Sequence, residues 1–172
     1  MRPSAAPVLV ALLVATACKA RDPKQDFEVR DVETYWAVDN PRGETQYVAP
    51  VVRFRVRNRT TGALRSVEAQ ATFKRGAQED KWPSGLAVLA TPRKPLAPGG
   101  EAFAEIKSEG RYSMRDTAPE TMLANEAFVD AEAEIFLREG NSSWTVVATV
   151  PVERRIGSKN AVIPVLPAAP QR

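Results

Sequence analysis

Four arginines, Arg53, Arg55, Arg57 and Arg59, occupy alternate positions between residues 51 and 59. Successive side chains of a β-strand point to opposite faces, so a strand here places the four guanidinium groups in one row, about 7 Å apart. A guanidinium group binds a carboxylate or a phosphate through two parallel hydrogen bonds. The row predicts either an anion-binding face or a solvated face paired with acids on neighbouring strands. We favour the paired face, because acidic residues alternate in other segments of the chain.

The single cysteine, Cys18, directly follows the apolar stretch 5–17. A stretch of this length is typical of a secretory signal and is too short to span a bilayer. Its end, Ala15-Thr16-Ala17-Cys18, resembles the lipobox of bacterial lipoproteins. The resemblance implies that 1–17 is a signal peptide and that Cys18 carries palmitate-type acyl chains. Lys19 implies an outer-membrane location, facing the periplasm or the cell surface. The alternative is a plain secretory signal with an incidental cysteine.

The chain lacks the residues that several common catalytic and metal-binding sites require. The chain has no histidine, so a Cys–His nucleophile pair is excluded, and one cysteine permits neither an internal disulfide nor a Cys-type zinc site. Asp130, Glu132 and Glu134 imitate a calcium ligand set, but calcium sites need a loop that wraps the ion. The net charge of +3, with both signs interspersed, does not indicate nucleic-acid binding. We therefore predict no catalytic residue, no metal, no cofactor and no nucleic-acid partner.

Three tryptophans could stack on a ligand such as a sugar. Trp36 and Trp144 fall on strand faces that we expect to be buried. Trp82 precedes Pro83 in an irregular segment, so Trp82 is the candidate for a ligand contact.

The elements that position these residues are short alternating segments. Residues 27–38 alternate twice with a change of phase, which a β-bulge near Asp31 would correct. Thr117 and Glu120 form a capping-box pattern, and they predict one short helix over 118–124. Further strands are expected at 51–58, 66–75, 86–90, 101–107, 127–138 and 144–155. About seven short strands with turn signals between them predict an all-β fold, an immunoglobulin-like antiparallel β-sandwich.

The chain divides into four parts. The signal peptide over 1–17 precedes a polar, lipid-anchored tether over 18–26, and the sandwich follows over 27–156. Residues 157–172 have prolines at every third position, which predicts a flexible tail in an extended conformation. The alternative for this tail is that its apolar residues dock along an open sheet edge or on a partner.

The stretch from about 48 to 107 resembles the small bacterial immunoglobulin-like modules that are grouped by an FxLYD motif. The residues that carry the resemblance are Asn58, Phe73, Gly76, Leu96, Pro98 and Gly99. The resemblance implies a fold, because such modules decorate secreted and lipid-anchored proteins without a known activity.

The sequence thus predicts a non-catalytic binding or structural domain in the bacterial cell envelope. Acylated Cys18 would bind membrane lipid, and the domain would meet a protein or glycan partner there. One alternative is a binding module that holds anionic glycans or lipid headgroups through the arginine row. The other alternative is an enzyme of a type that the sequence does not specify.

Overall fold

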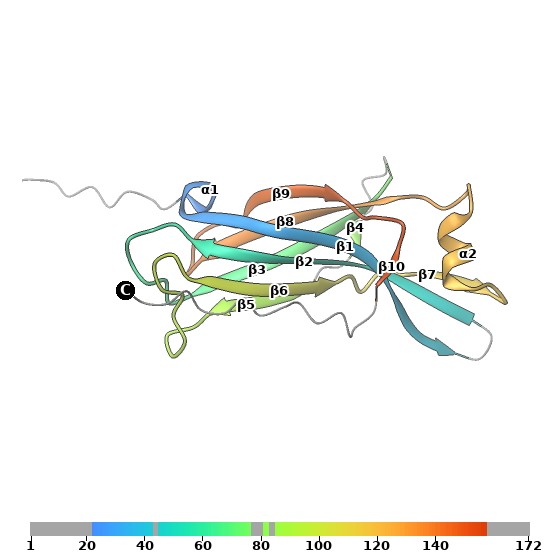
Figure 1. Ribbon diagram of the computed structural model, residues 1–172, viewed down its shortest axis with the longest axis horizontal. Coiled ribbons are helices and arrows are strands. Elements are labelled where there is room, and N and C mark those ends of the chain that lie inside the picture. The colour runs from blue at the N-terminus through green and yellow to red at the C-terminus, as the bar shows by residue number, and fades with distance from the viewer. Residues whose placement is uncertain (1–21, 43–44, 77–80, 83–84, 158–172) are drawn as a thin grey trace, which may run out of the picture.

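The computed structural model describes residues 22–42, 45–76, 81–82 and 85–157. These residues form ten strands and two short helices (Figure 1). The elements of the first half are α1 (Pro23–Asp26), β1 (Phe27–Arg42), β2 (Thr45–Asn58), β3 (Val67–Arg75), β4 (Lys81–Trp82) and β5 (Leu86–Ala90). Those of the second half are β6 (Glu101–Lys107), β7 (Tyr112–Arg115), α2 (Pro119–Ala124), β8 (Ala131–Glu139), β9 (Thr145–Pro151) and β10 (Ile156–Gly157). Neither helix has the length or the hydropathy needed to cross a bilayer.

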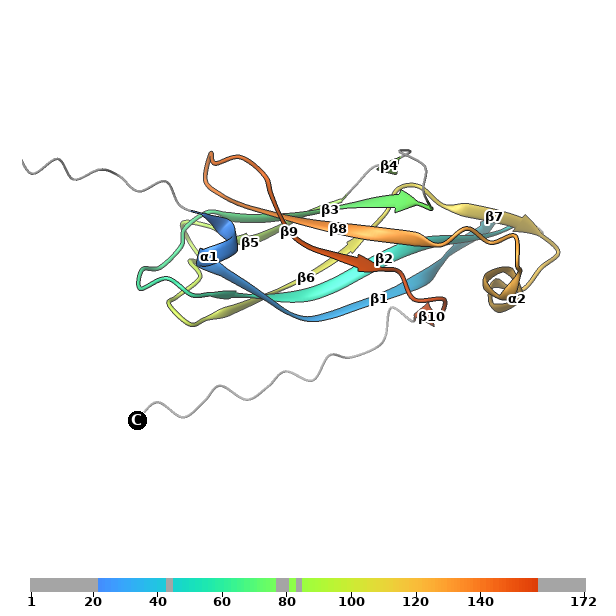
Figure 2. The same cartoon turned by 90° about the horizontal axis from the view of Figure 1, so that it is seen from above.

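Two sheets pack face to face as a β-sandwich (Figure 2). The first has the order β10-β1-β2-β6, with β7 pairing with the start of β2. The second has the order β4-β3-β8-β9, with β5 pairing with β3. Every pairing is antiparallel except the two-residue pairing of β10 with β1. The predicted fold class is confirmed. The described strands outnumber the predicted seven because β4, β7 and β10 have only two to four residues, too few for a visible alternation.

The core lies between the two sheets and follows the two-residue period of the sequence. Val52, Phe54 and Val56 of β2 are fully buried and face the second sheet. Phe73 of β3 and Ile135 of β8 are also fully buried, from the opposite layer. The apolar flanks of successive strands therefore meet in one dry layer, as the alternation predicted.

Two bulges set the phase of the strands. Asp31 has a φ of +50°, and the β1–β2 register shifts between Arg30 and Glu33, which confirms the predicted bulge. A second shift, between Ile135 and Phe136 of β8, lies opposite β9 and was not predicted. It reverses the phase of β9, because Ala148 pairs with inward-facing Ile135 while Val146 pairs with Phe136.

Trp144 was therefore predicted wrongly as a core residue. Its ring lies 4.5 Å from the guanidinium carbon of Arg138, on the outer side of β8. The strand expected over 127–138 begins later than predicted, at Ala131, and Val129 before it is 42% exposed.

The predicted helix over 118–124 is present as α2, but its predicted cap is wrong. Ala118 occupies the N-cap position and offers no side-chain hydrogen bond. The hydroxyl of Thr117 instead donates to the carbonyl of Arg115. Met122 and Leu123 are buried and attach α2 to the core.

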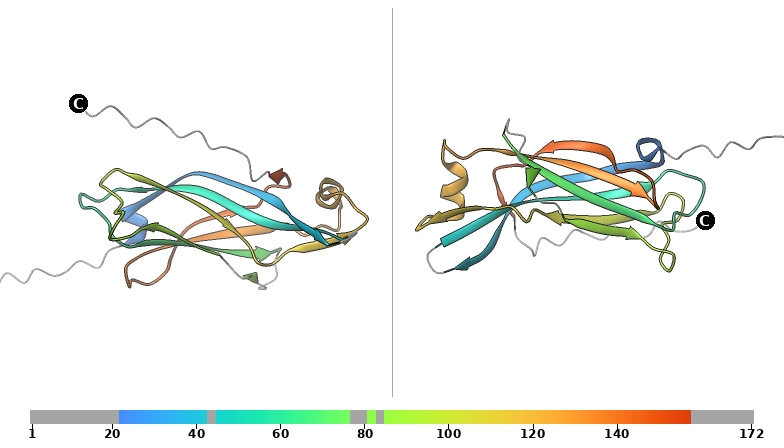
Figure 3. Two further views of the ribbon diagram at one scale, coloured as in Figure 1. Left: turned by 90° about the horizontal axis from the view of Figure 1, so that it is seen from below. Right: turned by 180° about the vertical axis from the view of Figure 1, so that it is seen from behind.

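The sandwich has two different ends (Figure 3). One end carries α1 together with the β2–β3, β5–β6 and β8–β9 connections. We call it the loop end. The other end carries the end of β1, the start of β2, β7 and α2. Residues 1–21 and 158–172, which include the predicted signal peptide, Cys18 and nearly all of the proline-rich tail, lie outside the described residues.

The helix α1 lies within the segment 18–26 that the sequence analysis assigned to a tether. Asp22 caps it by accepting a hydrogen bond from the amide of Lys24, and Pro23 is buried. The amide of Arg59 donates to the carbonyl of Asp26 at 2.8 Å. The last residues of the assigned tether, from Asp22 on, are therefore part of the folded domain.

Candidate anion-binding surface

The arginine row lies on the outer face of the first sheet, on β2. The strand runs between β1 and β6, so Arg53, Arg55 and Arg57 each have a neighbour on both sides, while Arg59 follows the end of the strand. Arg53 pairs in register with Glu33 of β1 and Glu105 of β6, and Arg57 pairs with Glu28 and Glu101. Acidic residues thus flank two of the four arginines across the sheet, as the paired reading predicted.

The middle of the row is engaged with these acids. Arg53 is only 9% exposed, and its Nε and Nη2 atoms donate to Oε2 of Glu33 at 3.0 and 2.5 Å. Nη2 of Arg155, from the C-terminal end of the domain, lies 3.6 Å from the same oxygen. Nε of Arg55 lies 3.5 Å from Oδ2 of Asp31, the bulge residue of β1. These two arginines are committed to carboxylates of their own chain.

Tyr35 extends this network on the outer face of β1. Its ring lies 5.6 Å from the guanidinium carbon of Arg53 and 5.7 Å from that of Arg155. Burial, followed by the neighbouring carboxylate of Glu105, raises the pKa of Tyr35 to about 12. The hydroxyl therefore stays protonated at physiological pH and donates its hydrogen bond to Glu105.

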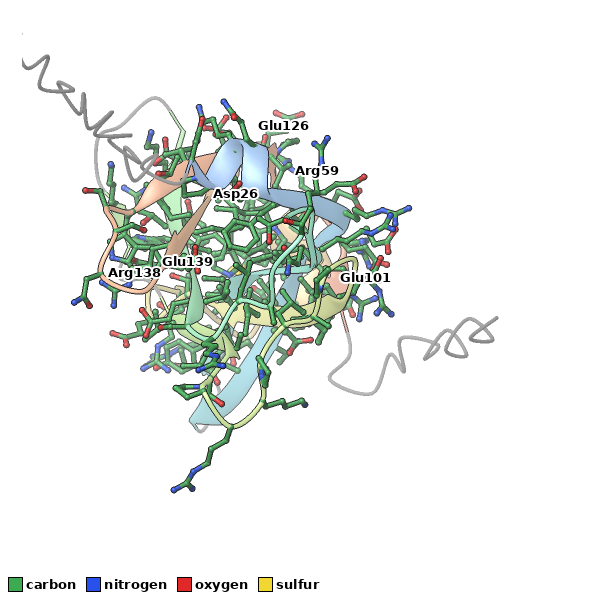
Figure 4. The ribbon with its side chains drawn as sticks, turned by 90° about the vertical axis from the view of Figure 1, so that its left-hand side faces the viewer. Asp26, Arg59, Glu101, Glu126, Arg138 and Glu139 are labelled. Carbon is green, nitrogen blue, oxygen red and sulfur yellow. The ribbon has the colours of Figure 1, made fainter. Side chains whose placement is uncertain are left out.

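The end of the row differs from its middle. Glu28 and Glu101, which flank Arg57, both turn to Arg30, at 3.7 and 3.2 Å. Arg57 is exposed and lies along the β5–β6 connection, close to Gly99. Arg59 is also exposed and lies beside Asp26 of α1 (Figure 4). Within the described part of the chain, neither Arg57 nor Arg59 has a carboxylate partner.

Asn58 determines where the loops of this end lie. The side chain is fully buried, and its amide nitrogen lies within hydrogen-bond distance of the carbonyls of Gly62, Leu96 and Ala97 at 2.8, 3.0 and 3.1 Å. Its amide oxygen accepts from the backbone amide and the hydroxyl of Thr60, at 2.8 and 2.7 Å. One side chain thus joins the β2–β3 connection to the β5–β6 connection. The residues Asn58, Leu96, Pro98 and Gly99, singled out in the FxLYD resemblance, meet at this joint.

The other candidate residues from the sequence, Trp82 and the acids Asp130 and Glu134, contact neighbouring side chains of the fold. Trp82 packs against Trp36 and Tyr112, with ring centroids 6.5 and 5.1 Å apart, and is only half-buried. The structure therefore places Trp82 at the rim of the aromatic core and not in a free loop. Oδ1 of Asp130 accepts from Nε of Arg154 at 2.6 Å, and Oε1 of Glu134 accepts from Nζ of Lys74 at 2.5 Å.

In the described segments, no group of three or more His, Cys, Asp or Glu side chains is placed to hold a metal ion.

The open side of the sandwich, between the edge strands β5 and β6, holds a surface hollow of about 400 Å³. Val88 and Phe103, which are 59% and 44% exposed, line it together with Lys94 and Glu101. Sequence reasoning missed this hollow, although the ambiguous position of Phe103 among charged residues of 101–107 was a signal of an exposed aromatic side chain.

No protein-family model and no curated protein matches the chain. Among solved structures, a β-glucuronidase from Bacteroides uniformis is similar at 13% identity, over 69% of this chain and 12% of the enzyme, with a TM-score of 0.41. A protein from Arabidopsis thaliana solved in solution is similar at 18% identity, over 85% of this chain and 92% of that one, with a TM-score of 0.43. These likenesses concern the fold alone and assign no activity, substrate or partner.

Proposed function

We propose that the protein is a lipoprotein of the bacterial cell envelope, in which acylated Cys18 anchors a non-catalytic β-sandwich that acts as a binding or structural domain. The lipobox-like sequence Ala15-Thr16-Ala17-Cys18 supports the anchor. The engagement of Asp130 with Arg154, and of Glu134 with Lys74, supports a structural role for the acids that could otherwise have served chemistry.

The observation that carries the proposal is the short distance in sequence between Cys18 and the folded domain. The helix α1 is capped by Asp22, four residues after Cys18. Four residues span at most about 14 Å when fully extended. An acylated Cys18 would therefore keep α1, at the loop end, within about 14 Å of the membrane surface.

Processing in the native bacterium tests the anchor. Globomycin, which blocks the lipoprotein signal peptidase, should cause the full-length precursor to accumulate. Mass spectrometry of the mature protein should show an N-terminal residue derived from Cys18 that carries acyl chains. Cys18→Ser should abolish both effects. A mature N-terminus that lacks acyl chains, in cells whose other lipoproteins are acylated, would overturn the proposal in favour of a plain secretory signal.

The alternative function of the arginine row is to bind anionic glycans or lipid headgroups. It is supported only at the end of the row that holds Arg57 and Arg59. Arg53 and Arg55 are held by Glu33 and Asp31, so the middle of the row presents paired charges. Arg57 and Arg59 retain exposed guanidinium groups.

A further inference from the structure

Whether a basic side chain forms an ion pair depends on where it lies in the domain. Most basic side chains along the sheets form an ion pair with a carboxylate, as Arg53, Lys74 and Arg154 do. Six exposed basic side chains gather at or next to the loop end, and within the described residues they have no such partner. We call this set the basic end. It consists of Lys24, Arg57, Arg59, Arg65, Arg93 and Lys94.

Hydrogen bonds of the backbone bring these residues together from distant parts of the sequence. The amide of Arg59 bonds to α1 through Asp26. Leu64, next to Arg65, exchanges two backbone hydrogen bonds with Leu96 of the β5–β6 connection, at 2.8 and 2.9 Å. Thr91 and Lys94 exchange a further pair, which closes the turn that carries Arg93 and Lys94. The positions of the cations are therefore set by the fold.

Four acidic side chains lie at the same end, and three of them have a partner within the fold. Asp22 caps α1, Glu101 accepts from Arg30 at 3.2 Å, and Glu139 also has an interaction partner. Asp26 has one carboxylate oxygen that is buried without a hydrogen-bond partner. The six cations of the basic end outnumber these four acids, of which Asp22 and Glu101 are exposed.

We propose that the basic end contacts the anionic lipid headgroups of the membrane in which Cys18 is anchored. This inference rests on the proposed anchoring, which brings the loop end close to that membrane. Lysine and arginine residues near an anionic membrane surface are each attracted to it, and the attraction falls off within about 10 Å at 0.1 M salt. The reach of residues 18–22, at most about 14 Å, allows several members of the basic end to enter this range together.

The form of the surface favours lipid over a soluble anion. The basic end is spread over α1, the end of β2 and two loops, and all six of its members are exposed; Arg59 is labelled in Figure 4. Such an array matches many headgroups in one plane, whereas a single phosphate needs donors that converge on one point. The contact would fix the orientation of the sandwich on the membrane.

Vesicle binding by the mature chain with Cys18→Ser tests the contact without the acyl anchor. Vesicles of phosphatidylglycerol and phosphatidylethanolamine should sediment the protein, and vesicles of phosphatidylcholine should not. Binding should weaken steeply between 50 and 300 mM salt. The variant Arg59→Gln/Arg65→Gln/Arg93→Gln/Lys94→Gln should lower the partition coefficient by at least ~100-fold, since each charge near the surface is worth about a factor of five.

The matched control removes four exposed charges away from the loop end. It is Lys81→Gln/Lys107→Gln/Arg111→Gln/Arg115→Gln, and β6 alone separates Lys107 from the loop end by about 20 Å. We expect this control to change the partition coefficient by less than about threefold. Unchanged thermal unfolding of both variants would show that they remain folded.

Three results would overturn the inference. These are equal binding to phosphatidylcholine, an equal loss in the two variants, or displacement by millimolar glycerol phosphate, which would indicate a site for a soluble phosphate. Because these vesicle measurements use the chain without acyl groups, their outcome is independent of whether Cys18 is acylated in the cell. Failure of the basic end and failure of the anchor can therefore be told apart.

Discussion

Replacing Asn58 by alanine should remove the joint between two loops, and its cost can be worked out from the hydrogen bonds. The amide group has two hydrogens that serve three carbonyls, and its oxygen accepts two bonds from Thr60. A hydrogen bond contributes about 1 kcal/mol net to the free energy of unfolding, and a buried group left without a partner costs more. Only the bond to Leu96 is fully buried, so water can replace part of the rest. We expect a loss of about 3 kcal/mol.

Urea unfolding measures this loss as a shift of the transition midpoint at constant slope. Asn58→Asp should be at least as destabilising, because it keeps the acceptor but removes both donors and directs a carboxylate at three carbonyls. Amide exchange should accelerate first at Leu64 and Leu96, whose backbone bonds join the same two loops. Asn141→Ala, at an exposed turn position, is the matched control and should change stability by less than about 0.5 kcal/mol. A loss below about 1 kcal/mol for Asn58→Ala would refute this account of the loop end.

Two further predictions concern the outer sheet and the aromatic core. The pKa of Tyr35 lies near 12, above the ordinary value of 10, so the unfolded chain releases this proton first, and stability that is full below pH 10 should fall as the pH rises towards 12. Tyr35→Phe should remove that part of the alkaline loss and the latest component of the absorbance titration at 295 nm. An alanine at Gly110 would place its Cβ within the ring of Trp82, so Gly110→Ala should cost about 1–3 kcal/mol and alter tryptophan fluorescence. Gly62→Ala, which has open space around it, should be neutral.

Much of the architecture could be predicted because it follows from local rules. The two-residue period places Val52 and Phe54 on one face of β2 whatever the neighbouring strands are. The change of phase near Asp31 indicated a bulge, because one extra residue is the simplest way to keep both halves of a strand amphipathic. The expectation that basic side chains pair with acids on neighbouring strands also holds between β3 and β8, where Lys74 bonds to Glu134.

Other features depended on relations between strands that one segment cannot reveal. The bulge in β9 leaves Trp144 outside although the sequence alternates without interruption there. The assignment of partners along the arginine row depends on the register of three strands at once. Arg30, from β1, takes both glutamates that flank Arg57. Arg53 and Arg57 both have two glutamates beside them in register, so this competition from Arg30 explains why Arg53 is paired while Arg57 remains exposed.

The two readings of the arginine row are therefore not exclusive, because they apply to different parts of one strand. Where β2 lies between β1 and β6, each arginine has neighbours on both sides, and the acids supplied by Glu33 and Asp31 neutralise Arg53 and Arg55. Where the strand leaves the sheet after Asn58, neighbouring strands end and no further acids can be supplied from them. Continuing the same alternation to Arg59 then produces an exposed cation at the end that carries α1. A row that stabilises the sheet in its middle can in this way present charge to a membrane at its end.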